Sequence, residues 1–241
     1  MRTDRYLVWS PDVLAAREGG WPGVLADTLS RHAADVSADT ADLAPHVSGF
    51  PWDDPRTMHA DWPGDRWWRE TESVFADAFA AVGVPRRRAD SLAEAVGPVY
   101  RDTDRWRVHP EAESVLDATC DRGWTPLLLA NAPPDLPDVL AELGLTFSET
   151  FVSATTGYEL PHPRAWETVY DWAGDGRFWA VGTDVERDCE PAWEAGVPVV
   201  QVTDGVASTG GRRHGMASGE AASEEWDRTA ALAEVPDLLP E

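Results

Sequence analysis

The chain has 241 residues, 43% of them hydrophobic, so we expect a folded protein with one good core and a smaller inserted or appended unit. Its formal net charge is −23 and its 20 basic residues are all arginine, which disfavours binding to nucleic acid or an anionic membrane surface because phosphate groups are repelled. No apolar run approaches the roughly 20 residues of a membrane span, and the apolar stretch at the start is too short for a signal peptide, so we expect a cytoplasmic protein.

The acidic residues are dispersed along the chain rather than gathered in one tail. This distribution is typical of a salt-adapted, halophilic organism, in which surface carboxylates keep proteins hydrated. An acidic protein that binds a partner through its charge would instead concentrate the carboxylates. At molar salt the Debye length falls to about 3 Å, so self-repulsion within the chain is screened. We therefore expect the protein to lose structure in dilute buffer.

The first predicted element is a buried strand over residues 5–9 (RYLVW), which ends before Pro11. From Val13 to Tyr100 no segment has the pattern of a strand. Residues 24–34 and 67–81 instead carry apolar side chains at spacings of three and four, which is typical of amphipathic helices. This pattern predicts a helical insertion after the first strand.

Strands and helices alternate in the second half of the chain. The expected strands are residues 125–130, 151–154, 178–181 and 197–202. The expected helices are residues 111–121, 136–143 and 164–173, the end of a helix at 191–195, and a last helix at 224–233. Residues 205–223 are rich in Gly, Ser and Ala and predict a flexible loop. Alternation at this spacing predicts an α/β fold with a doubly wound parallel sheet.

The chain contains 13 tryptophans. We interpret most of them as packing residues, because large rings bury much area. Trp67 and Trp68 are expected to place one ring inward and one partly outward, and Trp166, Trp172 and Trp193 to lie on core-facing helices. An aromatic ligand site in the insertion is the alternative.

Four segments at or near expected strand ends carry a recognisable order of motifs. They are RYLVWSPD at residues 5–12, LLLANAP at 127–133, GYELPHP at 157–163 and VGTDVERD at 181–188. With this order the chain resembles the haloacid dehalogenase-like (HAD) hydrolases that carry a helical cap. The resemblance covers nearly the whole chain. It implies a Rossmann-like α/β core formed by residues 1–14 and 108–241, with an inserted α-helical cap at residues 15–107.

The resemblance also implies where catalytic groups would stand. The family uses a nucleophilic Asp with an acid–base Asp two residues later, a Ser or Thr, a Lys, and acidic residues that hold Mg²⁺, because a phosphate attacked by a carboxylate must be neutralised. Asp12, Asn131 and Asp188 match retained positions. The four key groups are replaced by Ser10, Ala130, Leu160 and Thr183.

Two functions follow from these replacements. The leading interpretation is a pseudoenzyme that has lost phosphohydrolase activity. It would act as a binding, scaffold or regulatory protein for a protein partner or a small-molecule ligand. A small ligand could bind in an apolar pocket under the Trp-rich cap. The alternative is an active hydrolase of a small phosphorylated metabolite with a rearranged acidic site and Mg²⁺. The remnant catalytic candidates are Ser10, Asp12, Asn131 and Asp188.

Metal binding has its own pair of interpretations. Asp12, Asp184 and Asp188 are the candidate metal ligands, because oxygen donors suit Mg²⁺ or Ca²⁺. Alternatively these carboxylates are solvated or cap a helix, with Asp184 at a helix N-terminus, where the helix dipole favours a negative charge. No other cofactor is expected.

Overall fold

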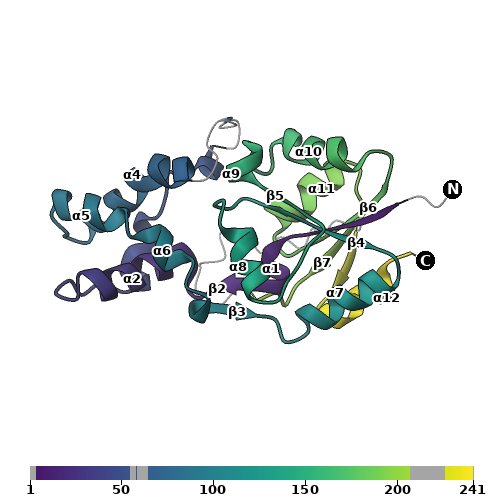
Figure 1. Cartoon of the computed structure of the whole chain (residues 1–241), viewed down its shortest axis with the longest axis horizontal. Coiled ribbons are helices and arrows are strands. Elements are labelled where there is room, and N and C mark those ends of the chain that lie inside the picture. Colours follow the sequence, from purple (N-terminus) through teal and green to yellow (C-terminus); the bar gives the residue numbers. More distant parts are fainter. Residues whose placement is uncertain (1–3, 55–57, 59–64, 207–225, 241) are drawn as a thin grey trace.

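A computed structural model describes residues 4–54, 58, 65–206 and 226–240. A layered α/β part contains the sheet, and a group of helices lies to one side of it (Figure 1). The loop predicted at 205–223 lies outside the described residues from 207 onward. None of the described helices is long and apolar enough to cross a membrane.

The described strands of the main sheet are all parallel. Their order is β5-β4-β1-β6-β7-β8. The chain runs from β1 outward to β4 and β5 on one side and then returns to β6 on the other, so β1 lies at the switch point where such sheets bind ligands. The predicted doubly wound parallel sheet is therefore confirmed. The bounds are β1 Arg5–Trp9, β4 Thr125–Ala130, β5 Glu149–Val152, β6 Arg177–Gly182, β7 Val199–Val202 and β8 Asp227–Thr229.

Both faces of the sheet are buried, which is why its strands are apolar throughout. Along β1, Leu7 and Trp9 belong to the core on one face, and Tyr6 and Val8 belong to the core on the other. The first face is covered by α7 Ala112–Asp121, α8 Leu136–Glu142 and α12 Val235–Leu238. The opposite face is covered by α10 Pro163–Ala173 and α11 Glu190–Glu194 (Figure 1).

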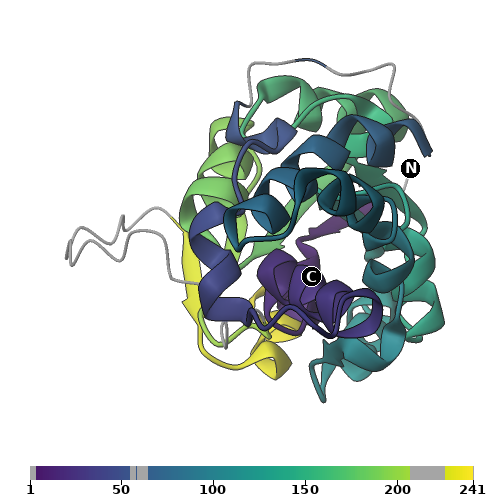
Figure 2. The same cartoon turned by 90° about the vertical axis from the view of Figure 1, so that its left-hand side faces the viewer.

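The helical segment, residues 20–100, buries a hydrophobic cluster of its own with Leu25, Phe75 and Phe79 at its centre. Trp67 is fully buried and Trp68 only partly, as predicted. Figure 2 views the molecule from this side, with the purple and blue helices in front of the sheet. The helices are α2 Gly20–His32, α3 Thr40–Leu43, α4 Asp65–Ala81, α5 Arg86–Ala93 and α6 Val96–Tyr100, with 3-10 turns at Ala44–His46 and Pro51–Asp53.

A short ribbon joins the helical segment to the sheet. After α1 Pro11–Leu14, strand β2 Ala15–Arg17 pairs antiparallel with β3 Trp106–Val108, which follows a 3-10 turn at Thr103–Arg105. The expectation that residues 13–100 hold no strand is wrong at β2. Three residues are too few to show an alternating pattern, and the pairing partner is distant in the sequence.

Three other expectations differ from the structure. Within its described part, the helix expected at 224–233 is β8 followed by a 3-10 turn at Leu232–Glu234, because Thr229 pairs with Val202. The strand expected at 151–154 is β5, which ends earlier because α9 Ser153–Thr156 begins there. Trp166, Trp172 and Trp193 lie on the core-facing helices α10 and α11 as expected, but only Trp166 is buried, and Trp172 and Trp193 are 47% and 40% exposed instead of packed inside.

Candidate functional site

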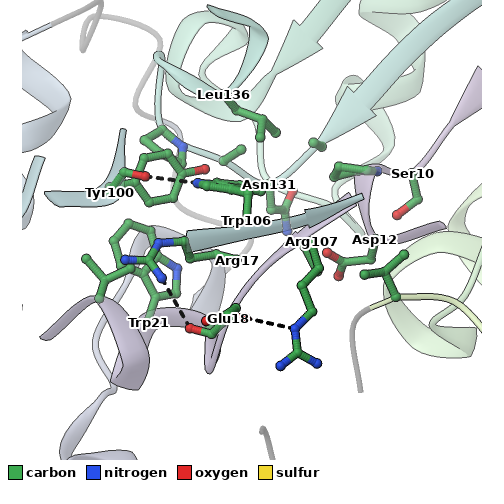
Figure 3. Close-up of a pocket in the computed structure, with 18 of the residues that line it drawn as sticks. Ser10, Asp12, Arg17, Glu18, Trp21, Tyr100, Trp106, Arg107, Asn131 and Leu136 are labelled. Carbon is green, nitrogen blue, oxygen red and sulfur yellow. Dashed lines mark hydrogen bonds and ion pairs between the residues drawn. The ribbon is translucent and has the colours of Figure 1, made fainter. Parts of the chain in front are cut away.

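A pocket of about 330 Å³ lies at the carboxyl ends of β1 and β4, between the sheet and the helical segment (Figure 3). Core residues form one wall, and residues of the β2–β3 ribbon and the helical segment form the opposite wall. The core wall includes Ser10, Asp12, Ala130, Asn131, Leu160 and Asp188. The opposite wall includes Arg17, Glu18, Trp21, Val24, Tyr100, Trp106 and Arg107.

Ser10 is positioned by the sheet. It directly follows β1, its amide donates to the Val181 carbonyl at 2.9 Å, and its side chain is buried. Its hydroxyl donates a hydrogen bond to Asp188. The group at the central strand end is therefore a hydroxyl that is held by a carboxylate.

Asn131 fixes the main chain of Leu160. Its Nδ2 donates to the Leu160 carbonyl at 2.9 Å, and its Oδ1 accepts from the Leu160 amide at 2.6 Å. Both polar ends of this amide are thus used to hold the loop. Leu160 and Ala130 are buried and present only apolar atoms to the pocket from their side chains.

Asp188 is held by the turn that follows β6. Its Oδ2 accepts from the amides of Thr183 and Asp184 at 2.9 and 3.0 Å. Burial raises the pKa of Asp188, and the hydrogen bonds from these amides and from Ser10 oppose that rise in part. Gly182 makes the arrangement possible, because a Cβ at this position would lie 2.4 Å from the Cβ of Asp188.

Thr183 and Asp184 lie outside the pocket lining. The Thr183 carbonyl accepts from Gln201 Nε2 at 3.2 Å. Asp184 is exposed, and its Oδ1 accepts from the Arg187 amide at 3.0 Å at the start of the π-helical turn Val185–Cys189. The capping alternative therefore describes Asp184, and the sequence position next to the lost acidic residue does not bring it into the pocket.

The donor set does not fit the magnesium site that the resemblance implies. Asp184 caps a helix, Asp188 already accepts three hydrogen bonds, and the Asp12 carbonyl accepts from the Val206 amide at 3.1 Å. Within the described ranges, no group of three His, Cys, Asp or Glu is placed to hold a metal ion. The predicted set of Asp12, Asp184 and Asp188 does not converge, and we derive no chemical step through a metal.

Asp12 differs from these residues because its carboxylate accepts no hydrogen bond from any described residue. Asp12 is exposed to solvent within the pocket that it lines. Desolvation by the surrounding protein, followed by repulsion from Asp188, raises the pKa of Asp12 to about 7. Arg187 opposes the rise and Asp184 adds to it.

The wall opposite the core carries groups that no motif indicated. Arg17 Nη2 pairs with Asp27 at 2.7 Å, and Arg107 Nε pairs with Glu18 at 3.0 Å (Figure 3). The rings of Trp21 and Tyr100 stack with centroids 5.3 Å apart. The abundance of tryptophan was the one relevant signal in the sequence, and it did not distinguish these positions from packing residues.

Comparison with known proteins places this geometry in a fold family. No protein-family model matches the chain. A phosphoserine phosphatase from Thermus thermophilus is 34% identical over 140 residues, which span 56% of this chain and 55% of that protein. The match thus spans about half the length of this relative.

Solved structures match over nearly the whole chain. A 2-haloacid dehalogenase from Pseudomonas syringae aligns with a TM-score of 0.64 at 17% identity, covering 98% of this chain and 97% of that one. A putative HAD-hydrolase from Bacillus subtilis, bound to magnesium, aligns with a TM-score of 0.71 at 12% identity, covering 100% of both chains. At 12–17% identity, these likenesses show that the chain has the fold of the HAD proteins.

Within this HAD fold, the pocket occupies the ligand-binding end of the sheet. Three of the four substituted positions, Ser10, Ala130 and Leu160, line it, and the fourth, Thr183, supplies an amide to Asp188. Among the described lining residues there is neither a carboxylate at the position of Ser10 nor a histidine that could activate its hydroxyl. The arrangement offers a partly open space lined by apolar and aromatic side chains, with two carboxylates at the core end and ion-paired arginines on the opposite wall.

Proposed function

We propose that this HAD-fold protein does not hydrolyse phosphate esters through a covalent aspartyl intermediate and instead binds a small molecule in the pocket. The observation that carries the proposal is the core wall, where Ser10, Ala130 and Leu160 meet. Ser10 places a hydroxyl where the HAD hydrolases have their nucleophile. Ala130 places a methyl group where they have a hydrogen-bond donor, and Leu160 places an isobutyl group where they have a cation.

The chemistry of phosphate explains why these replacements matter. A phosphate dianion attacked by a nucleophile requires cations and donors aimed at its oxygens. The core wall instead presents Asp12 and Asp188, which repel it, and its arginine, Arg187, is exposed and screened by solvent. Loss of one well-placed electrostatic donor costs about 10²–10³ in rate, and loss of the nucleophile removes the covalent route.

The pocket itself supports binding of a small ligand rather than scaffolding. Its volume of about 330 Å³ lies within the range of about 300–1,000 Å³ that is typical of small-molecule sites. Its lining combines apolar and aromatic side chains with polar and charged groups that could fix the orientation of a ligand.

A hydrolase of a small phosphorylated metabolite is the second candidate. It is favoured by the partial identity to a phosphoserine phosphatase and by Asp12, whose pKa of about 7 suits an acid–base group at neutral pH. Mg²⁺ would be the cofactor under this alternative. The donor set described above is the argument against it.

A phosphatase assay separates the two candidates. The purified full chain is tested in molar KCl with Mg²⁺ against a panel of phosphate esters that includes phosphoserine. We expect no turnover above the blank, and the same rate for Asp12→Asn. Wild-type turnover that Asp12→Asn abolishes would contradict the proposal. The variant carrying Ser10→Asp, Ala130→Ser, Leu160→Lys and Thr183→Asp serves as the gain-of-function comparison.

A further inference from the structure

We propose that the ligand of this pocket is a small organic cation, a protonated amine carried on an apolar or aromatic body. The inference rests on the proposed binding function and adds the chemical class of the ligand. It follows from the charge at the core end of the pocket, from one buried hydroxyl and from the aromatic wall.

The first step is the charge at the core end. Asp12 faces the pocket and has neither a hydrogen bond nor an ion pair with any described residue, and Asp188 lies near enough to repel it. The neighbouring Leu160 is buried and uncharged. Asp12 is exposed to the water of the pocket, and a carboxylate without a counter-ion is stabilised when a cation enters, because opposite charges attract.

The second step weighs Arg187, a cation that lines the pocket close to Asp12. The repulsion of Asp12 by Asp188 exceeds its attraction to Arg187, and Asp184 adds to the repulsion. Arg187 is also exposed, so solvent and salt screen it. The balance of charge at Asp12 is therefore negative.

The third step concerns the arginines of the opposite wall. Arg17 is compensated by Asp27, and Arg107 by Glu18. Arg105 shares both of these carboxylates, so the arginines of this wall are engaged in ion pairs within the protein. Burial is the main cause that raises the pKa of Tyr100; the charges of Asp12 and Asp135 add to the rise, and Arg17 opposes it.

The fourth step is the Tyr100 hydroxyl. Tyr100 is 6% exposed, lines the pocket, and makes no side-chain hydrogen bond to any described residue. Figure 3 shows Tyr100 on the wall opposite Ser10 and Asp12. A tyrosine hydroxyl can accept as well as donate, so this one is available to accept a hydrogen bond from a ligand in the pocket.

The fifth step is the aromatic wall. Trp21 and Trp106 flank Tyr100 with ring centroids 5.3 and 5.4 Å from it, and all three line the pocket. Aromatic faces attract organic cations through their quadrupole and bury the apolar body of a ligand. Carboxylates at one end and aromatic rings at the other match an amine on an apolar body.

The test uses three probes that share one phenyl ring and differ in the charged group: phenethylamine, 3-phenylpropionate and phenyl phosphate. Their affinities for the full chain are measured by titration calorimetry at pH 8, where Asp12 is ionised, in a salt concentration that keeps the protein folded. We expect the amine to bind about tenfold more tightly than either anion, which corresponds to one ion pair with limited solvent screening.

Two variants assign the effect to residues. Asp12→Asn is expected to weaken amine binding about tenfold, while Asp117→Asn, which removes the same charge from the exposed face of α7, leaves it unchanged. Tyr100→Phe is expected to weaken it about threefold to tenfold, and Tyr158→Phe, which removes a hydroxyl outside the pocket lining, serves as its control.

Three results would overturn the inference: tighter binding of either anion, unchanged amine affinity in Asp12→Asn, or no amine binding by protein that circular dichroism shows to be folded. Failure of the proposed function is a separate result. It would be seen as release of phosphate from phenyl phosphate or from the ester panel, whichever probe binds best.

Discussion

The ion pair between Arg17 and Asp27 connects the β2–β3 ribbon to helix α2. Arg17 Nη2 lies 2.7 Å from Asp27 Oδ2, and Arg105 adds bonds to both carboxylate oxygens at 2.9 Å. The side chains of Arg17 and Asp27 are 4% and 16% exposed, so water screens the pair poorly. We predict that Asp27→Asn destabilises the protein, because it leaves the buried guanidinium of Arg17 without its counter-ion.

The magnitude follows from burial. At an effective dielectric constant of about 20, two unit charges about 4 Å apart attract by about 4 kcal/mol. Removal of one partner from a buried pair costs about 3–5 kcal/mol, because the other charge stays buried. Asp27 is partly exposed and asparagine retains an acceptor oxygen, so we expect a loss of about 2–3 kcal/mol in the free energy of unfolding.

Urea titration followed by tryptophan fluorescence measures this loss at fixed salt. Asp35→Asn is the matched control, because Asp35 pairs with Arg88 on the surface and its loss is expected to leave stability nearly unchanged. The double variant Arg17→Met with Asp27→Leu is expected to recover part of the stability, because no buried charge is left unpaired and Arg105, which also loses Asp27, is 42% exposed and still pairs with Glu18.

The pH dependence provides a second readout. Burial disfavours the Asp27 anion, but the hydrogen bonds from Arg105 and Arg17 together hold its pKa below the usual range. A lowered pKa stabilises the fold above the unfolded value of about 4, and the gain is lost as the pH falls below it. The difference between wild type and Asp27→Asn should therefore shrink below about pH 4. A difference under about 1 kcal/mol at neutral pH would refute the reasoning.

Three further predictions concern the pocket and the surface. The pKa of Asp12 is raised to about 7, so its contribution to stability falls as the pH rises from about 4 to 7. Asp12→Asn should therefore raise Tm at pH 8 and have little effect at pH 4. An unchanged Tm at pH 8 would contradict this. Gly182→Ala should lower the free energy of unfolding, measured by urea titration, by about 1–3 kcal/mol, because the new Cβ would lie 2.4 Å from that of Asp188. Unchanged stability would show that the turn adjusts to the added Cβ. The formal charge of −23 should make the thermal melt salt-dependent, with a lower Tm in dilute buffer than in molar KCl; identical melts by circular dichroism would count against salt adaptation.

Much of the fold could be predicted from the sequence because its signals are local. The apolar runs of β1, β4 and β6 indicate buried strands wherever they pair, and helices α4 and α10 carry their own periodicity. Pairings between distant residues could not be predicted in this way. Strand β2 exists because it meets β3, and β8 exists because it meets β7.

The same division applies to the candidate site. Through its resemblance to the HAD hydrolases, the sequence by itself predicted that Ser10, Ala130, Leu160 and Thr183 replace catalytic groups of that family, because the prediction requires only residue identities in the order of the motifs. Only the tertiary structure decided which of them meet. Ser10, Ala130 and Leu160 line one pocket, whereas Asp184 turns away to cap a helix.

The opposite wall of the pocket was decided entirely by tertiary structure. Tyr100 lies at the end of a helix in the helical segment, in a stretch with no recognisable motif, and it faces Asp12 only because the β2–β3 ribbon folds that segment over the sheet. The net field at Asp12, which sets the kind of ligand that we propose, is a sum over charges far apart in the chain. Such a sum depends on distances in space, and a linear sequence does not contain them.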